Sequence, residues 1–147
     1  MMESLRDAIL SHSETSIQRI AMDEPGAVAA SHTLHMCAEN DGAQHLVDLL
    51  VKLGADVNQF DESGVAPLHL MVANGRVHGA TQLLALGAAV DAPTRSRGDT
   101  SLHIAARARN QEMMELLLAF GADADAANSE GERPYGAARM ILDTDVL

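Results

Sequence analysis

Histidine and carboxylate side chains are the groups of this chain that could perform chemistry, because together they bind transition metals or transfer protons. The sequence has seven histidines beside 21 acidic residues. Three of the histidines follow a leucine, and these pairs recur every 34 residues, as Leu34-His35, Leu68-His69 and Leu102-His103. Equivalent positions in stacked helices lie about 10 Å apart. Zinc ligands lie at about 2 Å from the metal, so the three histidines cannot share one ion.

His32 and Cys37 are the remaining reactive side chains near this set. His32 and His35 would share a face only if both were helical, but His32 falls in the turn before the helix, so the pair is an incomplete metal site. Cys37 is the only cysteine, and it stands where Ala105 stands two periods later, which predicts a buried, inert thiol. The sequence also lacks nucleophile-elbow, phosphate-loop, HExxH and paired-cysteine motifs. We therefore expect no catalytic residues, no metal and no cofactor, and a protein that is not an enzyme.

Composition and charge restrict the classes of partner. The formal net charge of −11 repels nucleic acid and anionic membranes on average. No stretch approaches the ~20 apolar residues of a membrane span, and the N-terminus lacks the basic start and apolar run of a signal peptide. A single cysteine suits a reducing compartment. Unless an export signal has been removed, we expect a cytoplasmic protein that binds neither nucleic acid nor membranes.

A second marker keeps the period of the Leu-His pairs. The segment Gly-Ala-Asp-Val-Asn begins at Gly54, and related segments begin at Gly87 and Gly121, at spacings of 33 and 34 residues. Hydrophobic residues make up 47% of the chain but aromatic residues only 2%, and a core of small aliphatic side chains suits closely stacked helices. Two independent markers with one period therefore predict a solenoid of helical repeats.

Each period contains signals for a turn, two helices and a loop. Gly64 and Gly98 supply the backbone freedom for a tight turn. Pro67 suits a first helical position, and the Thr100 hydroxyl suits the capping of a helix start. The second helix contains a Leu-Leu pair and ends at a glycine. The Ala-Asp-Val-Asn that follows Gly54 is extended and turn-rich, as expected of a hairpin-like loop.

This pattern resembles the ankyrin-repeat family, in which Gly-x-Thr-Pro-Leu-His-x-Ala-Ala is followed by a Gly-His break, Leu-Leu and Gly-Ala-Asp-Val-Asn. The resemblance covers roughly residues 31–138. It implies an all-α ankyrin-repeat solenoid of stacked helix–turn–helix pairs joined by β-hairpin-like loops, with histidines that hydrogen-bond the backbone of neighbouring turns. We expect one domain, 1–147, with a degenerate N-terminal cap at 2–30, central repeats at 31–60, 61–93 and 94–127, and a truncated C-terminal cap at 128–147.

Departures from the family pattern fall in the first and last units and in one loop. The first unit has Ala30 in place of the turn glycine, lacks the proline and has an extra residue near Asn40-Asp41-Gly42. The loop at 91–98 also has one extra residue. The last unit reads Pro134-Tyr135-Gly136 where the family has Pro-Leu-His. These departures predict atypical end units and one lengthened hairpin.

The resemblance also implies the function, which is to bind a folded partner protein through the hairpin tips and the exposed face of each first helix. The residues that would make this contact are Glu39, Phe60, Glu62, Val65, Asn74, Arg95, Arg97, Asp99, Arg107 and Glu132. Basic residues concentrate in the third unit, as Arg95, Arg97, Arg107 and Arg109, and acidic ones in the first two, as Glu39, Asp41, Asp61 and Glu62. This predicts a groove that is acidic at one end and basic at the other, and scattered solvated charge is the alternative.

Two apolar features leave alternatives open. Phe60 either anchors a partner or packs within the stack. Leu53, Leu86 and Phe120 each precede a capping glycine, and this stripe either packs against the next unit or forms a contact surface. We expect a monomer that inhibits, sequesters or recruits its partner. The alternatives are self-association through the stripe, or metal-dependent regulation through the repeat histidines.

Overall fold

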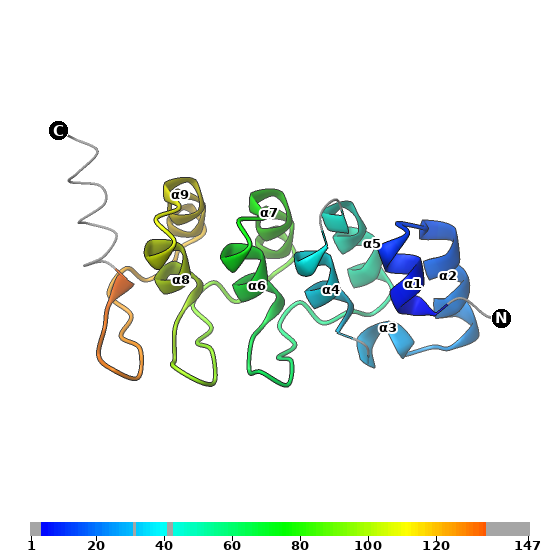
Figure 1. Cartoon of the computed structure of the whole chain (residues 1–147), viewed down its shortest axis with the longest axis horizontal. Helices are drawn as coiled ribbons and strands as arrows, with labels where there is room; N and C mark the ends of the chain where they lie inside the picture. Colours follow the sequence, from blue (N-terminus) through cyan, green and yellow to red (C-terminus); the bar gives the residue numbers. More distant parts are fainter. Residues whose placement is uncertain (1–3, 31, 41–42, 135–147) are drawn as a thin grey trace.

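The computed structural model describes residues 4–30, 32–40 and 43–134, and within these ranges it contains helices and no strand. Figure 1 shows the helices as a row of pairs from which loops project to one side. The helices are α1 (Leu5–Leu10), α2 (Glu14–Asp23), α3 (Ala27–Ala30), α4 (Thr33–Glu39), the 3-10 helix η1 (Ala43–Leu46), α5 (Val47–Lys52), α6 (Pro67–Ala73), α7 (Val77–Ala85), α8 (Ser101–Arg107) and α9 (Gln111–Ala119).

The helices form two layers. The first helices of the repeats, α4, α6 and α8, pack against one another in sequence, and the second helices α5, α7 and α9 do the same behind them. Three loops of similar shape follow the second helices, at residues 53–66, 86–100 and 120–133, and we call them the fingers (Figure 1). The predicted all-α solenoid of stacked helix pairs with hairpin-like loops is confirmed.

The predicted helix signals act where the sequence places them. Pro67 is the first residue of α6, and the Thr100 hydroxyl at the start of α8 accepts a 3.4 Å hydrogen bond from the His103 N–H. Helix α7 ends just before Gly87, whose φ of +99° is the left-handed conformation that glycine adopts without strain. These short helices therefore begin and end through local chemistry, although packing supplies most of their stability.

The core is aliphatic, as the composition predicts. It runs without a break from α1 to α9 and contains alanines between larger side chains. The largest fully buried apolar side chains are Ile9, Ile17, Val28, Leu34, Leu46, Leu50, Met71, Leu83, Leu102, Met113 and Leu117. Alanines between them let the helix backbones approach closely, which explains how a chain with so few aromatic residues fills its interior.

The two ends of the stack differ in what the structure describes. Helices α1 and α2 pair with each other, and α1 also packs against α4, which buries Ile9 and Ile17. The predicted C-terminal cap lies outside the described residues from position 135 onward. The predicted extra residue near Asn40 also lies outside the described residues, which do not include 41 and 42. The repeat boundaries themselves remain predictions.

The extra residue of the finger at 86–100 is visible in its tip. The Gly98 N–H bonds to the Thr94 carbonyl, four residues back, whereas Gly64 N–H bonds to the Asp61 carbonyl, three residues back. Adjacent fingers are joined by a backbone bond from the Arg95 N–H to the Gly64 carbonyl at 3.0 Å. A Cβ atom on Gly64 would lie 2.6 Å from the Arg95 Cβ, so only glycine permits this close approach.

Candidate partner-binding surface

The repeat histidines fasten each first helix to the finger that follows it. In all three, Nε2 donates to a backbone carbonyl, because a carbonyl oxygen can only accept. The bonds run from His35 to Val65 (2.8 Å), from His69 to Ala92 (2.7 Å) and from His103 to Glu132 (2.8 Å). This confirms the structural role that the resemblance implies for these side chains.

The second ring nitrogen distinguishes the first repeat from the other two. Nδ1 of His69 accepts from the Ala66 N–H at 2.9 Å, and Nδ1 of His103 accepts from the Thr100 N–H at 3.0 Å. Burial lowers the pKa of His69, which favours this neutral form. Nδ1 of His35 is buried and has no partner among the described residues. The corresponding N–H belongs to His32, whose left-handed φ of +50° replaces the extended backbone found at Thr100.

The Cys37 thiol and the possible metal ligands are the other groups that could perform chemistry. Cys37 is fully buried, and desolvation raises the pKa of its thiol to about 12, so it does not supply a thiolate nucleophile at neutral pH. Within the described ranges, no group of three or more His, Cys, Asp or Glu side chains is placed to hold a metal ion. Neither observation supports a catalytic or metal centre.

Asp99 lies at the centre of an ion-pair network between α8 and the last finger. Its side chain accepts from Arg107 Nη2 at 3.0 Å and from Asn128 Nδ2 at 2.9 Å. Only 5% of the residue is exposed, so the prediction that Asp99 is presented to a partner is wrong. It is buried because its two donors close over it. The Arg107 guanidinium is the main reason that the pKa of this carboxyl falls to about 2.

The same network uses the arginines of the expected basic end. Arg107 also donates to Glu132 at 3.2 Å, and Arg97 lies 3.7 Å from Glu130 and 4.0 Å from Glu132. We call Arg97, Asp99, Arg107, Asn128, Glu130 and Glu132 the arginine–carboxylate cluster. It contains three carboxylates and two guanidinium groups, so its charge is not positive. The expectation of a basic end is therefore wrong at Arg97 and Arg107.

Phe60 lies between neighbouring fingers. Its ring is half-buried, with its centroid 6.3 Å from that of His69, and the Arg95 guanidinium lies 4.6 Å above it. A cation over an aromatic face is attracted to the ring quadrupole. This placement favours the packing alternative for Phe60 and leaves Arg95 as the exposed member of the pair.

Four further residues expected at the surface have different degrees of exposure. Glu39 and Glu62 are exposed, whereas Val65 is half-buried and uses its carbonyl to bind His35. Asn74 is exposed, and its side-chain amide donates to the Ala38 carbonyl at 3.0 Å, which joins the second repeat to the first.

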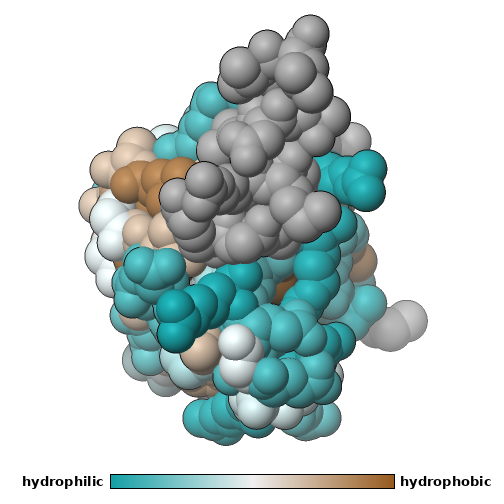
Figure 2. All heavy atoms as spheres, turned by 90° about the vertical axis from the view of Figure 1, so that its left-hand side faces the viewer, coloured by the Kyte–Doolittle hydropathy of each residue, from teal (hydrophilic) through white to brown (hydrophobic). Residues whose placement is uncertain are grey.

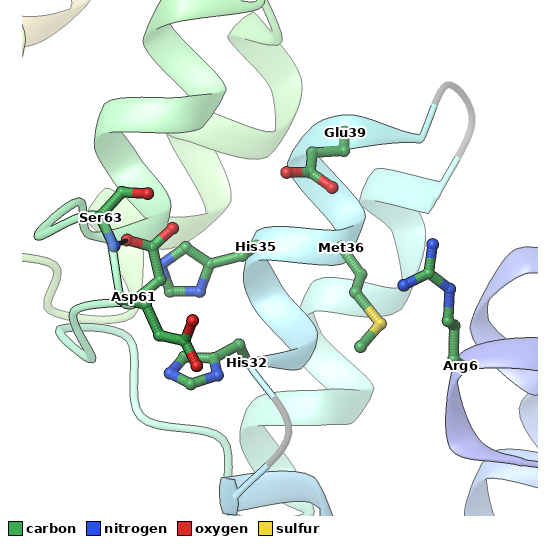
Figure 3. Close-up of a pocket in the computed structure, with 8 residues that line it drawn as sticks. Arg6, His32, His35, Met36, Glu39, Asp61 and Ser63 are labelled. Carbon is green, nitrogen blue, oxygen red and sulfur yellow. Dashed lines mark hydrogen bonds between the residues drawn. The ribbon is translucent and has the colours of Figure 1, made fainter.

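A cleft of ≈ 430 Å³ brings Glu39 and Glu62 together. Figure 3 shows Asp61 and Ser63 of the finger at 53–66 on one side, Met36 and Glu39 of α4 in the middle, and Arg6 of α1 on the other side of α4. Its lining residues are Arg6, His32, His35, Met36, Glu39, Asp61, Glu62 and Ser63. We call it the first-repeat cleft. Arg6 and Met36 were not among the predicted contact residues, because no repeat pattern shows that α1 packs beside α4.

The apolar stripe has mixed exposure. Leu53 is half-buried and packs on the core, whereas Leu86 and Phe120 are 38% and 41% exposed. Figure 2, which views the α9 end of the row, shows hydrophilic side chains over the loops and a hydrophobic area at the level of the helices. No helix in the described part of the chain is long and apolar enough to cross a membrane.

The first helices α4, α6 and α8 are each joined by a histidine to the finger that follows. A row of helix pairs built in this way defines a class of protein, the solenoid of helix–turn–helix repeats. Residues 34–129 match the family model for ankyrin repeats, in three copies. The chain belongs to the ankyrin-repeat family, whose repeats are typically non-enzymatic protein–protein interaction domains.

Several proteins are similar to this chain over part of their own length. Ankyrin repeat and SOCS box protein 5 of Oryctolagus cuniculus is 36% identical over 101 residues, 69% of this chain and 30% of the relative. The B-cell lymphoma 3 protein homolog of Mus musculus is 35% identical over 115 residues, 78% of this chain and 25% of the relative. Protein phosphatase 1 regulatory subunit 27 of Homo sapiens is 41% identical over 80 residues, 54% of this chain and 49% of the relative. The chain thus spans half or less of the length of each of these proteins.

Proposed function

We propose that this chain binds a folded partner protein through the fingers and the exposed face of the first helices, without catalysis and without a cofactor. The observation on which this rests is the rigid attachment of the fingers. Histidine bonds fix each finger to a helix, and backbone bonds such as that from the Ser129 N–H to the Arg97 carbonyl (2.8 Å) fix it to its neighbour. A surface ordered before binding loses less entropy when the partner docks.

The exposed side chains along this face are the contact residues of the proposal. They are Glu39, Glu62, Asn74, Arg95, Arg97, Arg107 and Glu132. Phe60 and Val65 support the face from beneath, and Asp99 holds two of its arginines. One relative is named as a regulatory subunit of protein phosphatase 1. By analogy with that name we propose that binding here inhibits, sequesters or recruits the partner, with the chain acting as a cytoplasmic monomer.

Capture of a partner from native extract on the immobilised full chain, with identification by mass spectrometry, tests the proposal. The partner's affinity is then measured calorimetrically for Arg95→Glu and for the control Lys52→Glu, which makes the same charge change at the end of α5. We expect Arg95→Glu to weaken binding about tenfold and Lys52→Glu to leave it unchanged. Equal affinities for both variants and the unaltered chain would show that the partner docks elsewhere.

Self-association is a second candidate, and the exposure of Leu86, Leu118 and Phe120 favours it. Apolar surface of this kind is often covered in an oligomer. Light scattering across a range of protein concentrations tests it. A concentration-dependent dimer that Phe120→Glu dissociates would support this function, and a strict monomer at high concentration would eliminate it.

A further inference from the structure

We propose that the first-repeat cleft receives an arginine side chain of the partner protein. This rests on the proposed function for the existence of a partner, and it assigns the chemistry of one contact. Neither the repeat pattern nor the relatives' names specify it. Three features of the cleft lead to it: its charge, an unused hydrogen-bond acceptor, and the flat surfaces of its lining.

The charge of the lining is negative. Glu39, Asp61 and Glu62 contribute three carboxylates against the single guanidinium of Arg6. Glu39 and Glu62 form no ion pair with any other described residue, in contrast to the acidic residues of the arginine–carboxylate cluster. Asp61 uses one oxygen, Oδ1, to accept from the N–H groups of Ser63 and Val65, at 2.9 and 3.1 Å. The cleft thus has unneutralised negative charge that attracts a cationic partner group.

The unused acceptor is Nδ1 of His35. Because Nε2 donates a hydrogen bond to the Val65 carbonyl, Nδ1 carries the free lone pair in this tautomer of the ring. His35 is 5% exposed, and its Nδ1 lacks a partner within the described residues, although the equivalent atom is satisfied in the other two repeats. A buried acceptor without a donor has lost its hydrogen bond to water and gained none in return, which destabilises the folded chain. A donor arriving from a partner would recover part of that cost.

The His32 ring covers this acceptor on the cleft side. The two rings are in edge contact, with centroids 5.4 Å apart, and Figure 3 shows one nitrogen of His35 directed toward His32. His32 is half-buried and makes no side-chain capping bond to the described residues. Because Nδ1 is buried, a partner's donor reaches it only if the His32 side chain moves aside.

Arginine fits this set of groups better than lysine. All the unpaired polar groups named above are acceptors, and they come from both α4 and the finger. A guanidinium has five donors in one plane and can bond a carboxylate with two of them while others reach a second acceptor. Its flat face also stacks on an imidazole such as His32, whereas an ammonium is a strongly hydrated point charge. The volume of ≈ 430 Å³ lies within the usual range of ligand pockets.

The test is an NMR titration of the full-length, ¹⁵N-labelled chain with a blocked Gly/Ser heptapeptide that has one central arginine. Matched peptides contain lysine or citrulline in place of the arginine. Citrulline keeps the N–H donors of arginine but lacks its charge. We expect saturable shifts confined to α4 and residues 61–65, affinity at least about threefold weaker for lysine, and still weaker for citrulline. Long-range ¹H–¹⁵N spectra should show a shift of His35 Nδ1 with the arginine peptide.

Two double variants locate the effect. Glu39→Gln with Glu62→Gln removes two cleft charges and should weaken arginine-peptide binding at least about tenfold. Glu112→Gln with Glu115→Gln removes the same charge from exposed positions on α9 and should leave binding unchanged. None of these four side chains is buried, so both variants should keep the circular dichroism spectrum and the melting temperature of the unaltered chain. Both properties are measured before the titrations.

Several results would overturn the arginine site. These are equal binding of the arginine and lysine peptides, equal weakening by the two double variants, or shifts spread over all acidic surfaces. A dimer that Glu39→Gln with Glu62→Gln dissociates would assign the cleft to a second copy instead. A captured partner weakened by Arg95→Glu but unaffected by the cleft variant would preserve the proposed function and overturn this inference.

Discussion

Helices α4 and α8 occupy the same place in the first and third repeats, yet their first turns are built differently. At α8, Thr100 is extended, so its hydroxyl caps the helix and its N–H bonds to His103. At α4, His32 is left-handed, and the Nδ1 atom of His35 has no partner in the described part of the chain. The comparison indicates that the backbone conformation of the residue three positions before the histidine determines whether Nδ1 of that histidine has a hydrogen-bond donor.

Charged side chains repeat this contrast between the two regions. Around α8, the arginines and carboxylates pair with one another in the arginine–carboxylate cluster. Around α4, Glu39 and Glu62 face a cleft without an ion pair among the described residues. Charges already paired within a protein gain little from a partner, because docking must replace contacts of similar quality. The comparison therefore favours the first repeat over Arg97 and Arg107 as the place where a partner's charge is recognised.

Mutation should lower the stability of the fold more in the arginine–carboxylate cluster than in the first-repeat cleft. Asp99→Ala removes a buried acceptor from Arg107 and Asn128, and we expect it to lower the free energy of unfolding by about 2–3 kcal/mol. Glu62→Ala at the open cleft should lower it by less than about 0.5 kcal/mol. Urea denaturation of both variants measures the difference. Similar losses at the two positions would mean that the cluster contributes no more stability than a solvated charge.

Most of the fold was predictable from the sequence, because the residues that start, end and space the helices recur in each repeat. Two markers with one period gave the solenoid, and Pro67, Thr100 and the glycines gave the ends of its helices. The structural role of the histidines followed from their recurrence. Each of these features depends on residues that are close together in the sequence, so the sequence alone is enough to predict it.

The pairing of side chains was not predictable in the same way. Asp99, Arg107 and Glu132 come from different segments, and only the register of the fingers brings them together. From the sequence alone the arginines of the third repeat look like available charge, because no local pattern places Glu130 and Glu132 of the next finger beside them. The cleft was missed for the same reason, since Arg6 reaches it from α1.

Acid should remove the stability that the ionised Asp99 side chain gives to the arginine–carboxylate cluster. Because the pKa of Asp99 is lowered from about 3.8 to about 2 in the folded chain, its ionised form stabilises the fold above pH 4. This contribution, about 2 kcal/mol, is lost as the pH falls through 2. Asp99→Asn has no such group. The stability difference between the unaltered chain and Asp99→Asn should therefore shrink between pH 4 and pH 2 in urea titrations, and a constant difference would refute the assignment.

The smallest effect is the most direct test of the comparison between the two helix starts. His103→Ala removes bonds at both ring nitrogens, to Glu132 and to Thr100, whereas His35→Ala removes only the bond to Val65. The Val65 carbonyl also keeps its bond from the Asp61 N–H. One net hydrogen bond contributes about 1 kcal/mol, so His103→Ala should cost about 1 kcal/mol more than His35→Ala.

His69→Ala is the matched control, because His69 is also bonded at both nitrogens. Its loss of stability should be close to that of His103→Ala. Chemical denaturation of the three variants under one condition gives the ranking. If His35→Ala lowers the free energy of unfolding as much as the other two variants do, Nδ1 of His35 has a hydrogen-bond donor in solution. The start of α4 is then hydrogen-bonded in the same way as the start of α8. The contrast in hydrogen bonding would then disappear, and with it the reason to expect a partner's donor at this position.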